Sequence, residues 1–150
     1  MRVSVIGGGT ITDEQAEQAR AVGRELGRRG HTVVCGGRGG TMEAVCRGAQ
    51  SEDGETIGIL PSGDRAEANA YVDVAIATGL GHARNAMVPL NGDAVIALTG
   101  GPGTLTEIGF ALIHGRPVVG LESHEIADVD LPVVNTPAEA VDWVEAAVDE

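Results

Sequence analysis

Short runs of apolar residues alternate with longer amphipathic segments along the whole chain. The short runs are almost continuously apolar, which is typical of strands buried on both faces of a parallel sheet. We expect strands at Val3–Ile6, Thr32–Cys35, Thr56–Leu60, Val72–Ala77, Asp93–Leu98 and Pro117–Leu121, with a short extended piece near Leu131–Val134. The longer segments predict helices over residues 13–29, 41–50, 81–90 and 137–148, and a further helix that ends at His114. This alternation predicts an α/β fold, in which residues 1–150 form a single doubly wound Rossmann-like domain. We expect a mostly parallel sheet of about six or seven strands.

Capping signals mark several helix ends. Thr12 and Gln15 have the spacing of a capping box, and Gly30 stands where the first helix would stop. Thr104 and Glu107 have the same spacing at the start of another predicted helix. Glu107 therefore has two open interpretations, as a helix cap or as a residue that contacts a ligand.

Three glycine clusters follow predicted strands, at residues 7–9, 36–40 and 100–103. The carboxyl ends of parallel strands meet at one edge of a sheet, so we expect the clusters to lie near one another. A glycine-rich turn before a helix leaves backbone N–H groups unpaired, and these attract phosphate. The chain has neither the GxGxxG dinucleotide fingerprint nor any lysine for a Walker motif. The clusters nevertheless predict a site for a phosphorylated ligand.

The amino-acid composition limits the classes of partner that the protein could bind. The formal net charge is −12, and all ten basic residues are arginine. Such a charge disfavours nucleic acid and anionic membranes, and the scarcity of aromatic residues removes stacking platforms for single strands. We therefore expect no nucleic-acid or membrane partner. The lysine-free, acidic composition fits either a salt-adapted cytoplasm or a genome rich in G and C, and both explanations remain open.

Neither a signal peptide nor an apolar stretch long enough to span a membrane is evident, so we expect a cytoplasmic protein. Cys35 and Cys46 lack the spacing of metal ligands or of a redox motif, and we expect buried thiols. Cys35 also adjoins a glycine cluster, so a role for Cys35 in lining the ligand site remains open. The sequence predicts no metal site and no required cofactor.

Three segments resemble one superfamily, in the same order along the chain. GGPGTLTE (100–107) resembles the PGGxGTxxE signature of the LONELY GUY phosphoribohydrolases, often labelled lysine decarboxylases, and CGGRGGTMEAV (35–45) is similar to their GGGxxGLM segment. GLGHARNAMV (79–88), followed by the DAVIAL strand, looks closer to the molybdenum-cofactor carrier proteins and their DprA/Smf-related relatives. The resemblance spans roughly residues 3–121 and implies a Rossmann-like fold.

The resemblance also implies roles for particular residues. In the phosphoribohydrolases, an arginine and the terminal glutamate act on an N-glycosidic bond, which places Arg84 and Glu107 in the catalytic roles here. Those enzymes typically have Lys where this chain has Asn85 and Pro where it has Thr99, and the Arg-Asn pair is the carrier-like form. His82 is the histidine that we place near the site. The predicted ligand- and phosphate-binding residues are Gly8, Gly9, Gly36, Gly37, Gly39, Gly40, Thr41, Arg84, Asn85, Gly100, Gly101, Gly103, Thr104 and Glu107.

Two functions follow as hypotheses. The first is a cytoplasmic binding or carrier protein for a phosphorylated, nucleotide-like ligand, either molybdenum cofactor or a nucleotide. The second is a nucleoside 5′-monophosphate phosphoribohydrolase, a hydrolase of N-glycosyl bonds. Lysine decarboxylation is excluded, because the chain has no lysine to hold pyridoxal phosphate. The charge argues against a DNA-processing role. Because relatives commonly assemble through helices that flank the site, we also expect a homodimer or homotetramer.

Overall fold

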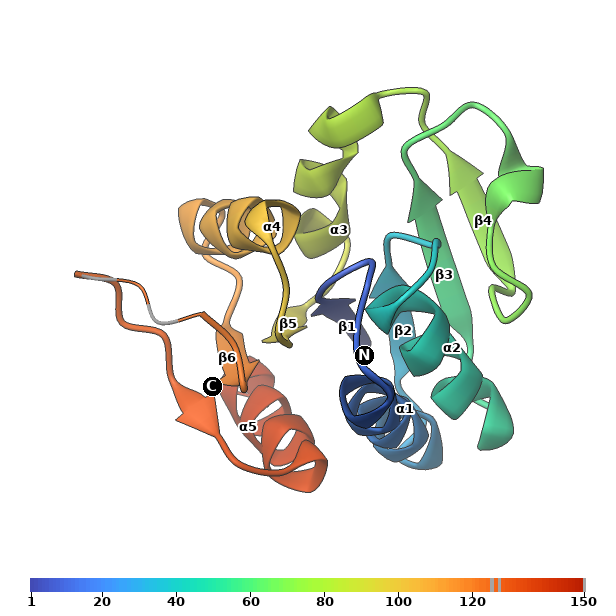
Figure 1. The fold of residues 1–150 in the computed structure, drawn as a ribbon. Coiled ribbons are helices and arrows are strands. Elements are labelled where there is room, and N and C mark those ends of the chain that lie inside the picture. The colour runs from blue at the N-terminus through green and yellow to red at the C-terminus, as the bar shows by residue number, and fades with distance from the viewer. Residues whose placement is uncertain (125, 127, 150) are drawn as a thin grey trace.

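The computed structural model describes residues 1–124, 126 and 128–149. Its core is a seven-stranded sheet in the order β4-β3-β2-β1-β5-β6-β7, in which all the pairings are parallel (Figure 1). The strands are β1 (Arg2–Ile6), β2 (Thr32–Cys35), β3 (Thr56–Leu60), β4 (Val74–Ala77), β5 (Ala94–Ala97), β6 (Val118–Leu121) and β7 (Val133–Val134). The predicted doubly wound α/β fold is confirmed.

Helices cover both faces of the sheet (Figure 1). They are α1 (Asp13–Arg28), α2 (Thr41–Ser51), α3 (Met87–Leu90), α4 (Pro102–Ile113) and α5 (Pro137–Asp149), with 3-10 turns η1 (Arg65–Glu67) and η2 (Gly81–Ala86). Buried residues of α1, α2 and α5 pack with Val3, Val5 and Val33 on one face. On the other face Val88 of α3 and Ile108 of α4 pack with Ile6 and Val95. Among the residues described, no helix is long and apolar enough to cross a membrane.

The element boundaries follow local chemistry closely. The Thr12–Gln15 capping box is confirmed, since the Thr12 N–H donates to the Gln15 side chain at 3.0 Å and the Gln15 N–H donates to Oγ1 of Thr12 at 3.1 Å. Gly30 follows the helix with φ of +79°. The predicted helix 81–90 divides into η2 and the short α3, and β4 begins two residues later than expected. The acidic run of residues 122–130 predicts a solvated loop, and part of it lies outside the described residues.

The start of α4 rules out the capping interpretation of Thr104 and Glu107. Helix α4 begins at Pro102, with Gly101 as its N-cap and no side-chain capping hydrogen bond. Proline suits this first helical position because its φ is already helical and it has no N–H to leave unpaired. Thr104 and Glu107 therefore lie inside the helix and form no capping box. Glu107 is left without a structural role at the helix end.

The order of the strands reverses between β1 and β5, and the loops that follow these two strands touch. The Gly8 N–H donates to the Thr99 carbonyl at 2.9 Å, and the Thr41 N–H donates to the Gly8 carbonyl at 3.0 Å. Ligands of doubly wound sheets bind at such a switch point, beyond the carboxyl ends of the strands. The topology thus brings the three glycine clusters to one edge of the sheet.

Candidate functional site

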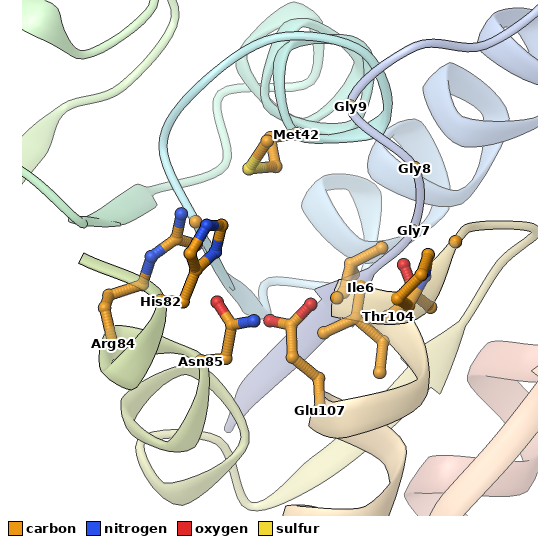
Figure 2. Close-up of a pocket in the computed structure, with 15 residues that line it drawn as sticks. Ile6, Gly7, Gly8, Gly9, Met42, His82, Arg84, Asn85, Thr104 and Glu107 are labelled. Atoms are coloured by element: carbon orange, nitrogen blue, oxygen red, sulfur yellow. The ribbon is translucent and has the colours of Figure 1, made fainter.

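A cavity of about 240 Å³ lies at this edge of the sheet. Its walls come from the loop after β1, the start of the loop after β2, the turn η2 and the first turns of α4 (Figure 2). The lining residues are Val5, Ile6, Gly7, Gly8, Gly9, Gly36, Met42, His82, Arg84, Asn85, Gly101, Pro102, Gly103, Thr104 and Glu107.

Helix α4 opens onto the cavity with its amino end. The N–H groups of Gly103 and Thr104 lie in the first helical turn, where intrahelical acceptors do not exist. The helix dipole adds partial positive charge at the same place. This wall of the cavity therefore favours an anion.

Arg84 of η2 and Glu107 of α4 bring a basic and an acidic side chain to the cavity (Figure 2). Glu107 is only 8% exposed, and it makes no hydrogen bond or ion pair within the described part of the chain. Burial raises the pKa of Glu107 to about 8, although the nearby Arg84 charge lowers it. Burial likewise lowers the pKa of Arg84, against the opposing effect of Glu107. The Nε atom of Arg84 is buried and has no hydrogen-bond partner among residues 1–124, 126 and 128–149.

Most of the predicted site residues meet at this cavity. Nine of them line it: Gly8, Gly9, Gly36, Arg84, Asn85, Gly101, Gly103, Thr104 and Glu107. His82, which we expected near the site, also lines this cavity. Val5, Ile6 and Met42 were missed, because apolar residues at a strand end or in a helix carry no signal that distinguishes a cavity wall from the core.

The other predicted residues, Gly37, Gly39, Gly40, Thr41 and Gly100, do not line the cavity. Several of them let the loops approach each other instead. A Cβ at Gly40 would lie 2.5 Å from the carbonyl oxygens of Gly8 and Gly9, and a Cβ at Gly100 would lie 2.1 Å from Oγ1 of Thr104. These glycines shape the site through backbone packing.

The two cysteines are both free and buried, as expected. Their Sγ atoms are 3.5 Å apart, beneath the Gly36–Gly40 loop. Cys35 is completely buried and does not line the cavity.

Residues 1–144 match the model of the SLOG cluster4 family. The chain belongs to this family. An uncharacterised protein of Archaeoglobus fulgidus is 38% identical over 143 residues, which cover 95% of this chain and 93% of that protein. The predicted superfamily is confirmed.

Solved structures show the same fold along the full chain. The molybdenum cofactor binding protein of Rippkaea orientalis superposes with a TM-score of 0.91 and 32% identity, covering 98% of this chain and 96% of that one. The molybdenum cofactor carrier protein of Chlamydomonas reinhardtii has a TM-score of 0.87 and 29% identity, covering 99% and 98%.

More distant similarities extend to an enzyme and to a DNA-binding protein. A cytokinin riboside 5′-monophosphate phosphoribohydrolase of Mycobacterium tuberculosis is 34% identical over 115 residues, which are 71% of this chain and 62% of the enzyme. DNA processing protein A of Helicobacter pylori is 16% identical with a TM-score of 0.71, covers 99% of this chain and 80% of its own, and shows a shared fold alone.

Proposed function

We propose that the protein binds or carries a phosphorylated, nucleotide-like ligand, either molybdenum cofactor or a nucleotide. The observation that carries the proposal is the half-buried Arg84, which lines a cavity while its buried Nε atom lacks a partner in the described chain. A buried polar group of this kind costs free energy unless something bonds to it. An anionic ligand would supply that bond.

Different walls of the cavity suit different parts of the ligand. The amino end of α4 and the backbone of Gly9 are suited to phosphate, because they present N–H groups rather than side chains, whereas the N–H of Gly8 already bonds to Thr99. Arg84 adds a permanent positive charge. Asn85 and Glu107 are buried polar side chains that are suited to the uncharged head of the ligand. The carrier proteins with the same fold support this assignment.

Calorimetric titration tests the proposal with nucleoside monophosphates, a pterin phosphate and inorganic pyrophosphate. We expect Arg84→Ala to weaken binding at least about tenfold, since a hydrogen bond to a charged group is worth about 1.5–3 kcal/mol. Arg65→Ala is the matched control. Arg65 is exposed in η1, so this substitution removes the same charge from a position outside the cavity. Equal affinities of Arg84→Ala and Arg65→Ala would refute the proposed site.

A second function, hydrolysis of a nucleoside 5′-monophosphate, is favoured by the pairing of Arg84 with Glu107 and by the similarity to phosphoribohydrolases. In this reaction water adds to C1′ of the ribose, and the base leaves with a proton as the N-glycosidic bond breaks. The ionised Glu107 would stabilise the oxocarbenium-like transition state and orient the water. Because the pKa of Glu107 is raised to about 8, activity would rise as the pH increases through that value.

Release of free base from a panel of nucleoside 5′-monophosphates separates the two functions. An enzyme releases base at a rate that Glu107→Gln abolishes, whereas a carrier binds without turnover. Base release by wild type that persists in Glu107→Gln would exclude the catalytic role of Glu107.

Homo-oligomerisation is a separate part of the proposal. Helix α4 exposes Leu105, Leu112 and Ile113, and Ile113 is 76% exposed. The one charged residue of α4, Glu107, is buried. A second copy of this strongly acidic chain could therefore cover α4 without charge repulsion. Light scattering on a sizing column tests this proposal, and we expect Ile113→Glu to shift the protein to monomer.

A further inference from the structure

We propose that Thr106 fixes the side-chain amide of Asn85, so that the cavity presents an oxygen acceptor at residue 85 and selects a ligand with an amino or N–H donor there. The inference deepens the proposed ligand-binding function and rests on it. It concerns the head of the ligand and not its phosphate.

A chain of hydrogen bonds determines the orientation of the amide. The Thr106 hydroxyl donates to the Gly103 carbonyl at 2.6 Å, one turn earlier in α4. A hydroxyl has a single proton, so Oγ1 of Thr106 can only accept from its other neighbour. That neighbour is Nδ2 of Asn85, at 3.2 Å. The opposite orientation of the amide would place two oxygens at this distance with no proton between them.

The amide oxygen of Asn85 is consequently the group left for the ligand. Asn85 is 9% exposed and lines the cavity, and its Oδ1 has no hydrogen-bond partner in the part of the chain that the structure describes. Figure 2 shows the amide nitrogen on the side of Glu107 and the oxygen on the side of Arg84 and His82. An acceptor in such a sheltered place discriminates strongly, because a ligand oxygen there would leave both oxygens unsatisfied.

The arrangement also orients the ligand. Phosphate oxygens are acceptors, which suit Arg84 and the N–H groups of Gly103 and Thr104 and are repelled by the Asn85 oxygen. An amino group has the opposite preference. A ligand that carries both groups therefore has one favoured direction in the cavity.

Pairs of nucleotides that differ by one exocyclic amino group test the inference. Guanosine and inosine 5′-monophosphates form one pair, and adenosine and purine-riboside 5′-monophosphates form another. We expect the amino-bearing member of at least one pair to bind about tenfold more tightly, as is usual when a buried acceptor gains or loses its donor. Equal affinities within both pairs would overturn the inference.

Variants of Thr106 test the positioning role. Valine has nearly the same shape as threonine, so Thr106→Val removes only the hydroxyl that accepts the hydrogen bond from the Asn85 amide. Thr106 is also exposed, so the substitution leaves the core unchanged. We expect this variant to bring the affinity ratio close to one while the affinity for inorganic pyrophosphate stays unchanged. Thr106→Ser keeps the hydroxyl and is expected to keep the ratio. An unchanged ratio in Thr106→Val contradicts the positioning role.

Proton exchange of the Asn85 side-chain amide, followed by NMR, decides the same question without a ligand. We expect slower exchange in wild type and Thr106→Ser than in Thr106→Val. If the nucleotides, the pterin phosphate and pyrophosphate all fail to bind wild type, the proposed function fails. Unaltered exchange in Thr106→Val would separately refute the hydrogen-bond chain.

Discussion

The guanidinium of Arg84 occupies the space that a side chain at Gly36 would need. A Cβ at residue 36 would lie 2.1 Å from Nη1 of Arg84 and 2.6 Å from Sδ of Met42. Both atoms are at the ends of flexible side chains, so the backbone could accommodate an alanine although Arg84 could not stay in place. Gly36 thus serves the candidate site more than the fold.

Gly36→Ala is therefore expected to weaken ligand binding with little effect on stability. Displacement of Arg84 should reduce the affinity for a phosphorylated probe about tenfold, while the free energy of unfolding changes by less than about 1.5 kcal/mol. Calorimetry and urea unfolding measure the two quantities. Gly109→Ala is the control, since a Cβ there meets no atom within 4 Å and should stabilise α4. Wild-type affinity in Gly36→Ala would show that Arg84 does not hold the ligand.

Gly40→Ala, unlike Gly36→Ala, should act mainly on stability and lower the free energy of unfolding. Gly40 has φ of +61°, and its Cβ would lie 2.5 Å from the carbonyl oxygens of Gly8 and Gly9. Because these atoms belong to the backbone, relief requires the two loops to separate. We expect a loss of about 3 kcal/mol in urea unfolding. Gly63→Ala, where a Cβ meets nothing within 4 Å, should stay near wild type. Similar stabilities of both variants would mean that the loops do not pack as described.

Glu107 should make the stability of the ligand-free protein fall with rising pH. Burial raises its pKa to about 8 from its ordinary value of 4.5, so between these values the folded state holds a proton that the unfolded state has lost. The contribution of Glu107 to the free energy of unfolding is complete below the pKa that its carboxyl group has in the unfolded chain. It then decreases by up to about 1.4 kcal/mol per pH unit until the pH reaches the pKa of Glu107 in the folded state. Glu107→Gln removes this dependence. We expect the stability of Glu107→Gln relative to wild type to increase across this window and to level off above about pH 8 in urea titrations. Parallel pH profiles for the two proteins would contradict a buried, protonated Glu107.

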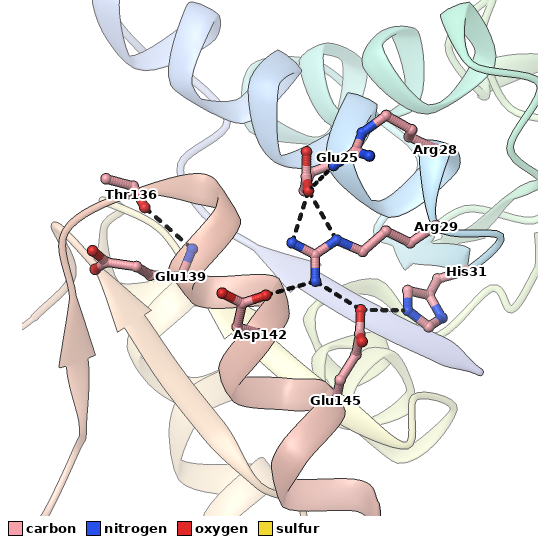
Figure 3. A network of polar contacts seen from close by, with 8 residues as sticks. All are labelled: Glu25, Arg28, Arg29, His31, Thr136, Glu139, Asp142 and Glu145. Carbon is pink, nitrogen blue, oxygen red and sulfur yellow. Dashed lines mark hydrogen bonds and ion pairs between the residues drawn. The ribbon is translucent and has the colours of Figure 1, made fainter.

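An arginine joins the carboxyl-terminal helix to α1 (Figure 3). Arg29 bonds to Glu25 at 2.8 Å, to Asp142 at 2.7 Å and to Glu145 at 3.0 Å, and it is only 22% exposed. His31 also contacts Glu145, at 3.1 Å. Without Arg29, Glu25 would keep Arg28 and Glu145 would keep His31, but Asp142 would lose its ion-pair partner and the three carboxylates of α1 and α5 would lose their shared positive charge.

We expect Arg29→Met to cost about 1–3 kcal/mol in urea unfolding, with the larger loss at low salt because ions screen the carboxylate repulsion. Arg28→Met is the matched control. Arg28 is 60% exposed and, among the described residues, pairs with Glu25 alone, so the change should stay within about 0.5 kcal/mol. Equal effects of the two substitutions would show that the contacts to α5 contribute nothing.

Salt dependence distinguishes the two explanations of the lysine-free composition. A protein of net charge −12 that is adapted to salt should lose several kcal/mol of stability when salt is removed, because unscreened repulsion favours the unfolded chain. Urea unfolding in molar and millimolar potassium chloride measures the loss. Stability that is nearly independent of salt would instead favour genome composition as the cause.

Much of the fold could be predicted from local patterns. The apolar runs that became β1, β2 and β3 end where expected, and Thr12 and Gly30 mark the ends of α1 through capping that involves only neighbouring residues. Errors occurred where the signal was ambiguous. The spacing of Thr104 and Glu107 matches a capping box, but Pro102 had already started the helix.

The candidate site could be predicted only in part from local sequence patterns. The glycine clusters, Arg84, Asn85 and Glu107 stand out by type and order, and nine of the predicted residues do meet at one cavity. Met42 and Ile6 line the same cavity without any distinguishing pattern, while Gly40 and Gly100 turned out to bring backbones together.

Local chemistry along the chain was enough to specify most of the strands, the ends of α1 and the candidate anion-binding residues, because these depend on side chains close together in sequence. The strand order, by contrast, depends on packing between distant segments. That order placed β1 beside β5 and so brought Arg84 to Gly36 and Glu107 into a desolvated cavity. The raised pKa of Glu107 and the fixed amide of Asn85 exist only after that packing, since burial and hydrogen bonding between separate elements produce them.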